Sequence, residues 1–211
     1  MKGLYIPKAF EQNDENKLYQ FIRENSFGIL FSQTENGPFA THLPFIVEEG
    51  RLVSHFAKAN PHWRSLDGSD VLVVFHGPHV YISPTWYEDD KTVPTWNYTA
   101  VHVSGKVSIV EDKKSLQESL AKLIYVNEQF EENPWATQFD LPYIERLMKG
   151  IVGVVIEIQE IEGKWKLNQH HPLERQKNTI KGLQKSNQLY AKHIASLMES
   201  NISKVEEKEE T

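Results

Sequence analysis

The chain has 211 residues, of which 39% are hydrophobic, which is enough apolar mass for one compact core. A formal net charge of −6 excludes a uniformly basic surface, so contact with nucleic acid would require a local basic patch or an oligomer. The sequence contains no cysteine, which excludes disulfides, thiolate metal sites and cysteine nucleophiles. No segment approaches the roughly 20 apolar residues that span a bilayer, and the first residues lack the apolar core of a secretory signal. We therefore expect a cytoplasmic protein with no membrane contact.

Up to residue 167 the chain predicts one short helix followed mainly by strands. The helix is expected after Asp14, because apolar residues recur there at the helical period. Apolar and alternating patterns predict strands over 27–31, 39–47, 51–56, 71–75, 80–82, 95–110, 151–158 and 164–167. Turn signals at 36–37, 76–79 and 162–163 separate several of these strands. The pair Asn60-Pro61 is typical of a helix start.

Helices are also predicted in the second half. Asp112 is expected to cap a substantial helix. A short helix is expected over 142–149, ended by Gly150. An apolar stripe over 189–198 predicts a C-terminal helix. Six or seven antiparallel strands with interposed helices indicate an α+β, mainly β architecture whose sheet closes into a barrel. We expect one domain over 1–183, a C-terminal helix over 184–205 packed on it, and a disordered tail over 206–211.

Histidine and tryptophan are concentrated in the middle of the chain. Six of the nine histidines and three of the five tryptophans lie between His42 and His102. Such a mixture suits a planar, apolar cofactor with an anionic tail. Aromatic rings would wall the cofactor, amides and imidazoles would meet its heteroatoms, and cations with free N–H groups would meet the tail.

Other interpretations of these residues stay open. A tryptophan taken alone is often core filling, and a histidine taken alone is often a satisfied imidazole. A metal site is the next alternative, but His76 and His79 flank a Gly-Pro pair and share no helical face, and the chain has no HExxH pattern. Ser54 and Ser83 lack the elbow motif of serine nucleophiles, and neither a GxGxxG motif nor a P-loop is present.

Six ordered motifs carry a resemblance to a known family. They are ATHLPF at 40–45, HFAKANPHW at 55–63, YISPTWY at 81–87, VPTWNY at 93–98, AVHV at 100–103 and KLNQ at 166–169. Together they resemble the PaiB family of FMN-binding negative transcriptional regulators, and the likeness runs from residue 5 to about residue 183. The resemblance implies an antiparallel split β-barrel of the pyridoxamine-phosphate-oxidase type, assembled as a homodimer with FMN in a groove at the interface.

The resemblance also implies a set of cofactor-binding residues and no catalytic or metal-binding residue. The isoalloxazine ring would be lined by Thr41, His42, Leu43 and Pro44. The ribityl chain would run along His55, Ala57, Lys58 and Asn60, and the phosphate would meet His62, Trp63 and Arg64. The second chain of the dimer would contribute Trp96, Asn97, Tyr98, Lys166 and Gln169.

The sequence departs from this pattern at the phosphate position. Oxidases of the fold grip the phosphate with arginine and lysine, whereas this chain has His62 in that segment. Histidine titrates near pH 6.5. We therefore expect modest FMN affinity that falls as pH rises, and purified protein that has lost part of its cofactor.

Three functions follow from the resemblance and the composition. The first is a regulator that lowers transcription of sporulation and protease genes, contacting DNA directly or through a partner protein. The sequence has one basic run, over 164–185, which could contact DNA or could simply be a solvated helix face. No helix-turn-helix is evident. The second is a flavin-dependent oxidoreductase on a small molecule, with His42 and His102 as candidate acid–base groups. The third is an interaction module without a cofactor.

Overall fold

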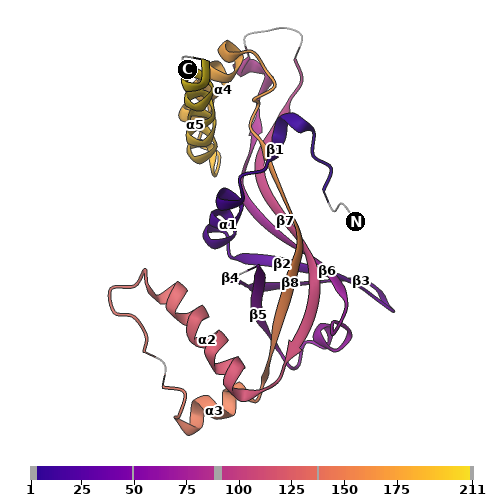
Figure 1. Cartoon of the computed structure of the whole chain (residues 1–211). Coiled ribbons are helices and arrows are strands. Elements are labelled where there is room, and N and C mark those ends of the chain that lie inside the picture. The colour runs from indigo at the N-terminus through magenta and orange to yellow at the C-terminus, as the bar shows by residue number, and fades with distance from the viewer. Residues whose placement is uncertain (1–3, 49, 88–91, 137, 210–211) are drawn as a thin grey trace. The chain divides into compact units, whose positions relative to one another are not determined.

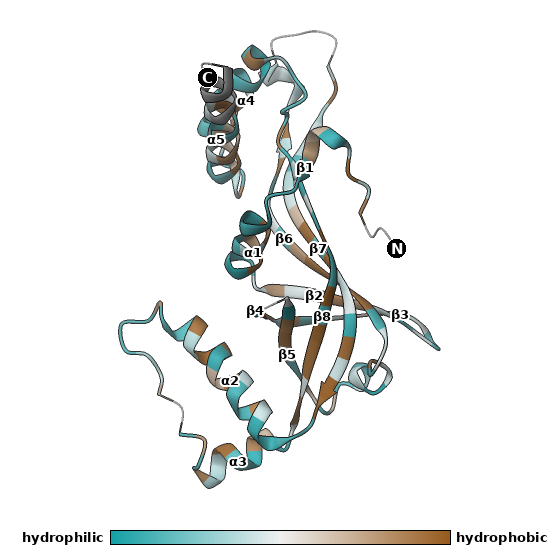
Figure 2. Ribbon diagram, viewed as in Figure 1, coloured by the Kyte–Doolittle hydropathy of each residue, from teal (hydrophilic) through white to brown (hydrophobic). Residues whose placement is uncertain are grey.

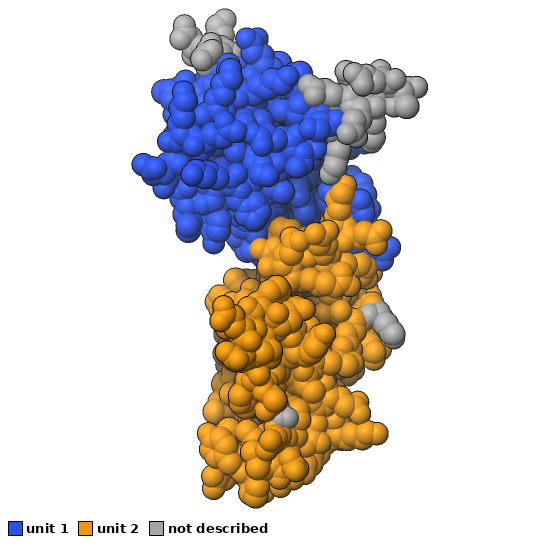
Figure 3. Space-filling model, turned by 90° about the vertical axis from the view of Figure 1, so that its left-hand side faces the viewer, with its two compact units in different colours: residues 1–15, 76–101, 162–211 blue, residues 16–75, 102–161 orange. Residues whose placement is uncertain are grey.

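The computed structural model describes residues 4–48, 50–87, 92–136 and 138–209. The chain forms two compact units, which Figure 3 colours separately. Unit 1 comprises residues 1–15, 76–101 and 162–211, and unit 2 comprises residues 16–75 and 102–161. No helix in the described ranges is long and apolar enough to cross a membrane.

Three long strands contribute residues to both units: β6 (Asp70–Ile82), β7 (Thr95–Val110) and β8 (Ile151–Lys166). Unit 2 adds most of α1 (Glu15–Glu24) and all of β2 (Phe27–Thr34), β3 (Gly37–Pro44), β4 (Ile46–Glu48), β5 (Arg51–Ala57), η2 (Pro61–Ser65), α2 (Lys113–Glu128) and α3 (Pro142–Met148). Unit 1 adds η1 (Lys8–Phe10), β1 (Glu11–Gln12), η3 (Pro84–Trp86), α4 (Leu173–Lys185) and α5 (Ala191–Glu209). Figure 1 labels the α-helices and the strands.

The strands are ordered β3-β2-β6-β7-β8-β5-β4, and β1 pairs with β8. The predicted hairpin at 36–37 is confirmed, because β2 and β3 pair antiparallel with Thr34 opposite Gly37. Gly37 has a φ of +108°, which residues with a Cβ rarely adopt. The predicted α+β class with an antiparallel sheet is confirmed. The described residues form eight strands. The expected strands 71–75 and 80–82 are one strand, β6, and 151–158 and 164–167 fall mostly in one strand, β8, whereas the short β1 and β4 were not expected as separate strands.

Two of the predicted turns are wrong. Residues 76–79 lie inside β6, and residues 162–163 lie inside β8, both of which continue without interruption. Neither Gly77 nor Gly163 has the positive φ that a tight turn would use. In β6 the buried side chains of Val80 and Ile82 follow the Gly-Pro pair, so packing of the strand outweighs the local turn preference.

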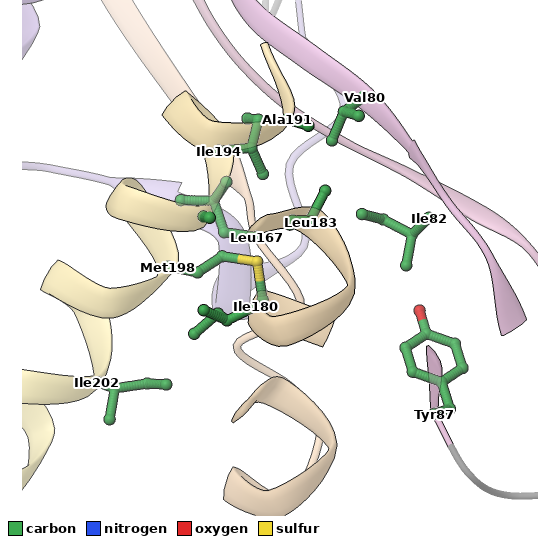
Figure 4. Packing of buried hydrophobic residues seen from close by; sticks show 11 residues of the cluster. Val80, Ile82, Tyr87, Leu167, Ile180, Leu183, Ala191, Ile194, Met198 and Ile202 are labelled. Carbon is green, nitrogen blue, oxygen red and sulfur yellow. The ribbon is translucent and has the colours of Figure 1, made fainter. Parts of the chain in front are cut away.

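The core of unit 1 lies between strand β6 and the two C-terminal helices. Val80 and Ile82 of β6 meet Leu183 of α4 and Ile194 and Met198 of α5 in one buried cluster (Figure 4). The apolar residues of α4 and α5 recur at helical spacing, so each helix presents one side to this cluster. Burying these side chains supplies the main stabilisation of unit 1, at about 25 cal/mol per Å² of apolar surface.

In unit 2 apolar residues cover both faces of the sheet. Hydrophobic colour is concentrated on β5 and β8, whereas the helices alternate between the two colours (Figure 2). On one side Phe45 and Phe75 meet edge to face, with ring centroids 5.6 Å apart. On the other side Leu123 of α2 packs against Val53 of β5. The predicted cap of α2 is confirmed, since Asp112 Oδ1 accepts from the backbone N–H of Ser115 at 2.9 Å.

The C-terminal part contains two helices, α4 and α5, rather than one. The expected domain boundary after residue 183 falls within α4, and the expected division of the chain stays a prediction. Helix α5 reaches Glu209, beyond the expected end at 205. Residues 210–211 of the expected tail lie outside the described residues, as do residues 88–91 in the loop before β7.

Candidate functional site

Polar side chains at the start of η2 form a hydrogen-bonded network in unit 2. Asn60 caps η2, because its Oδ1 accepts from the backbone N–H of His62 at 3.0 Å, and Pro61 occupies the first helical position. The Asn60 Nδ2 donates to Thr41 Oγ1 at 3.3 Å. The His62 ring lies between two hydroxyls, with Nδ1 2.8 Å from Thr41 Oγ1 and Nε2 2.8 Å from Ser32 Oγ. The network therefore connects η2 to strands β2 and β3.

Aromatic side chains enclose the His62 ring. It stacks on Phe39 with ring centroids 4.4 Å apart, and it meets Phe56 edge to face at 5.8 Å. Only 1% of His62 is exposed, and this burial lowers the pKa of its imidazole from 6.5. At pH 7 the ring is therefore neutral, and one nitrogen donates to a hydroxyl while the other accepts. The His62 ring is therefore buried and hydrogen-bonded to Thr41 and Ser32, and it is not an exposed cation.

Next to this network, Trp63 contacts the backbone of Lys58 and the guanidinium of Arg64. The Trp63 Nε1 donates to the carbonyl oxygen of Lys58 at 3.1 Å. The guanidinium of Arg64, which is exposed, lies 5.8 Å from the centre of the Trp63 ring. Together with residues of α2 and α3, Lys58 also lines a cavity of about 200 Å³. The segment from Lys58 to Arg64 thus combines two cations, a half-buried aromatic ring and the Asn60 amide.

Alternation along β3 divides the residues predicted for the flavin ring. Thr41 and Leu43 share one face of the strand, where Thr41 joins the His62 network and Leu43 is buried. His42 and Pro44 lie on the opposite face, where the exposed His42 stacks on Phe27 with ring centroids 6.0 Å apart. The structure therefore brings Thr41, but not the His42 side chain, to the network.

The same alternation separates His55 from the network. Phe56 faces His62, whereas His55 shares the opposite face of β5 with Val53, which packs against α2. Burial lowers the pKa of His55, and its Nδ1 is buried without a hydrogen-bond partner. Ala57 lies on the same face as His55 and is exposed.

The predicted residues of β7 lie in unit 1. Trp96 is 53% exposed, and its ring centroid lies 6.0 Å from that of Tyr81. Tyr98 lies near the amine of Lys164, which is 5.4 Å from its ring centroid. Asn97 is completely buried, and its Nδ2 donates to the Met198 sulfur at 3.5 Å, so it faces the core of unit 1.

The two remaining predicted residues, Lys166 at the end of β8 and Gln169 just after it, make contacts within unit 1. Lys166 Nζ donates to Thr95 Oγ1 and to the carbonyl oxygen of Trp96, each at 2.5 Å. Gln169 stabilises its own turn, because its Oε1 accepts from Leu167 N and its Nε2 donates to the carbonyl of Trp165. The predicted site residues thus form one group in unit 2 and a second group in unit 1.

Sequence reasoning missed Ser32 and the aromatic residues around His62. Ser32 and Phe39 are opposite each other in the β2–β3 register, directly beside the His62 ring. The available signal was a serine in a strand whose preceding residues are mostly apolar. A hydroxyl at such a position requires a hydrogen-bond partner, which His62 provides.

The sheet order and the helices define an α+β split-barrel protein, and the fold recurs in solved structures. The flavocytochrome Anf3 of Azotobacter vinelandii superposes with a TM-score of 0.62 at 13% identity, covering 78% of this chain and 74% of that one. The conserved hypothetical protein Rv2991 of Mycobacterium tuberculosis gives a TM-score of 0.59 at 16% identity, covering 80% of this chain and 94% of that one. These likenesses establish the fold alone.

Residues 4–160 match the family described as "Putative FMN-binding domain", and the chain belongs to this family. The protease synthase and sporulation protein PAI 2 of Bacillus subtilis is 39% identical, over 95% of this chain and 99% of that protein. An uncharacterized protein of Aspergillus fumigatus is 30% identical, over 86% of this chain and 91% of its own length. The PaiB-type resemblance of the six motifs is thereby confirmed.

Proposed function

We propose that this protein binds FMN and acts in the cytoplasm, as a homodimer, as a PaiB-type negative transcriptional regulator of sporulation and protease genes. The likeness to PAI 2 over nearly the full length of both chains supports the regulatory part. The family match over residues 4–160 supports the cofactor. The network of Asn60, Thr41 and His62, which lies within the matched region, is the observation that carries the ligand assignment.

The donor set of unit 2 fits the polar parts of FMN. Lys58 and Arg64 supply cations for the phosphate, and the Asn60 amide and Thr41 hydroxyl supply hydrogen-bonding groups for the ribityl chain. The buried His62 ring holds Thr41 in place through a hydrogen bond. This assignment replaces the expected cationic His62 by two residues that stay charged across the physiological range, so FMN affinity is expected to change little between pH 6 and pH 8.

FMN supplies a planar ring system that can be oxidised and reduced when it is bound. The chain's own contribution is to hold and orient it. We propose that Trp96 and Tyr98 are contributed by the second subunit of the homodimer, where the half-exposed Trp96 ring would cover the flavin.

The cofactor assignment can be tested on the purified protein. Mass spectrometry of the small molecules released on denaturation should detect FMN. The variant Lys58→Gln should bind FMN at least tenfold more weakly, because it removes a phosphate cation, whereas the exposed Lys106→Gln should bind normally. Equal affinities of the two variants would reject Lys58 as a phosphate contact.

The charge distribution favours α4 as the element that contacts DNA. Lys177, Lys181 and Lys185 are exposed and follow one another at four-residue intervals, so they share one side of the helix. The opposite side of α4 is buried through Ile180 and Leu183. Three lysines in a row are spaced to contact phosphates of a nucleic-acid backbone, although the chain as a whole is acidic.

A gel shift on a promoter fragment tests this assignment. In the double variant Lys181→Gln, Lys185→Gln, the slope of log binding constant against log salt concentration should become shallower by the amount that roughly two phosphate contacts contribute. Lys106→Gln on β7 is the matched control. Absence of any salt-dependent shift in the unmodified protein would reject direct DNA contact and leave regulation through a partner protein.

A further inference from the structure

A second cavity lies entirely within unit 1. Its volume is about 460 Å³, within the range of small-molecule pockets. Its walls come from the N-terminal segment around η1, from Tyr87 directly after η3, from the residues that lead into β7, and from the segment between the end of β8 and the first turn of α4. None of its lining residues belongs to the FMN network of unit 2.

Basic side chains gather on one side of this cavity. Lys166 is held by Thr95 and the Trp96 carbonyl, and the guanidinium of Arg175 lies 3.3 Å from His171 Nδ1. The rings of His170 and His171 are stacked at an angle, with centroids 4.0 Å apart. Four basic side chains therefore meet at one wall of the cavity.

The crowding of these groups has an electrostatic consequence. Burial lowers the pKa of His170, and the neighbouring Lys166 and Arg175 lower it further. The pKa of Lys166 is lowered by burial and by Lys164. Burial is the larger cause of both shifts and nearby positive charge is the smaller one, and a bound anion would offset this smaller contribution.

The remaining walls are apolar or aromatic. The Phe10 ring meets His170 edge to face at 5.1 Å, and the Tyr87 ring lies 5.2 Å from the Arg175 guanidinium carbon. Val93 and two prolines complete this side. A ligand with one anionic end and one apolar end would match both walls.

We propose that this cavity binds a small organic anion, namely a carboxylate or phosphate ester attached to an aromatic ring. The anionic group pairs with Lys166 and Arg175, and the ring lies against Phe10 and Tyr87. This site is separate from the proposed FMN site, so the protein takes a second ligand. In a regulator, such a ligand is suited to act as an effector.

Binding can be measured with two probes and a neutral analogue. Isothermal titration should show saturable binding of benzoate and of phenyl phosphate, and at least tenfold weaker binding of benzamide, which lacks the charge. The variant Arg175→Gln should weaken benzoate binding at least tenfold and leave FMN affinity within twofold. Lys192→Gln on α5, an exposed cation of the same unit, is the matched control.

The folded state of each variant is checked by circular dichroism. If Arg175→Gln is unfolded, Lys166→Gln replaces it, and imidazole NMR signals of His170 and His171 in the unmodified protein should shift on addition of benzoate. Benzamide binding as tightly as benzoate, or unchanged benzoate binding in the folded variants, would overturn the proposal. Displacement of benzoate by FMN would also overturn it, since the cavity would then be part of the flavin site. If the protein binds benzoate but not FMN, the proposed FMN-binding function is rejected and the second site is retained.

Discussion

The imidazole of His62 stacks on the phenyl ring of Phe39, with centroids 4.4 Å apart and an angle of 26° between the ring planes. Each ring nitrogen of this neutral histidine contacts a hydroxyl, and Phe56 meets the ring edge to face. The ring is therefore part of the core of unit 2. The buried His62 ring, which sequence motifs place at the phosphate, contacts Thr41 and Ser32 in this structure.

Charge at position 62 should destabilise the fold. The variant His62→Glu buries a carboxylate between two aromatic rings and should lower the free energy of unfolding by about 3 kcal/mol or more. The neighbouring exposed Arg64→Glu should stay within about 0.5 kcal/mol of the unmodified protein. Urea unfolding followed by circular dichroism measures both. A normal unfolding midpoint for His62→Glu would contradict the buried position.

The stability of unit 1 should depend on pH through His171. Burial, together with His170, Arg175 and Lys166, lowers the pKa of His171 to about 4. Because this folded-state pKa lies below the unfolded value near 6.5, the neutral ring contributes stability that is present above pH 6.5 and is lost as pH falls toward 4.

The variant His171→Gln isolates this contribution. Its urea midpoint should fall less between pH 7 and pH 4.5 than that of the unmodified protein, since the other titrating groups are common to both. Parallel falls in the two midpoints would show that His171 does not carry a lowered pKa.

Gly105 should not tolerate a side chain. A Cβ at this position in β7 would overlap with the carbonyl oxygen of Glu157 on β8, and a backbone atom cannot move aside cheaply. Gly105→Ala should therefore cost about 1–3 kcal/mol of stability, whereas Ser108→Ala, at an exposed position of the same strand, should be nearly neutral. Thermal melts of the two variants make the comparison, and equal melting temperatures would argue against this close strand approach.

Trp96→Ala should lower both FMN affinity and dimerisation while leaving unit 1 folded. Half of the Trp96 side chain is exposed, so its removal leaves little cavity in the core. Analytical ultracentrifugation and FMN titration of the same sample measure the two effects. If the variant instead unfolds, Trp96 serves mainly as a core residue.

Local signals predicted the features that depend on local geometry. The Asn60-Pro61 helix start, the Asp112 cap and the glycine of the β2–β3 hairpin each act within a few residues, and all three are confirmed. The turn expected at 76–79 was wrong because strand packing outweighs the Gly-Pro preference.

The site was harder to predict than the fold. His62 takes its partners from Ser32 and Thr41, 30 and 21 residues earlier in the chain, and no local pattern reveals that these contacts bury the ring. His42 and His55 belong to the same motifs, but strand alternation turns their side chains away from the network. Motif membership therefore indicates the region of a site, and pairing register decides which side chains reach it.

The binding of FMN compared with riboflavin tests the central claim most directly. Titration of flavin fluorescence with the purified, cofactor-free protein should show saturable binding of one FMN per chain. Riboflavin, which lacks the phosphate, should bind at least tenfold more weakly, a difference of about 1.4 kcal/mol in binding free energy. Equal affinity for the two flavins, or no saturable binding of FMN, would contradict the proposed function.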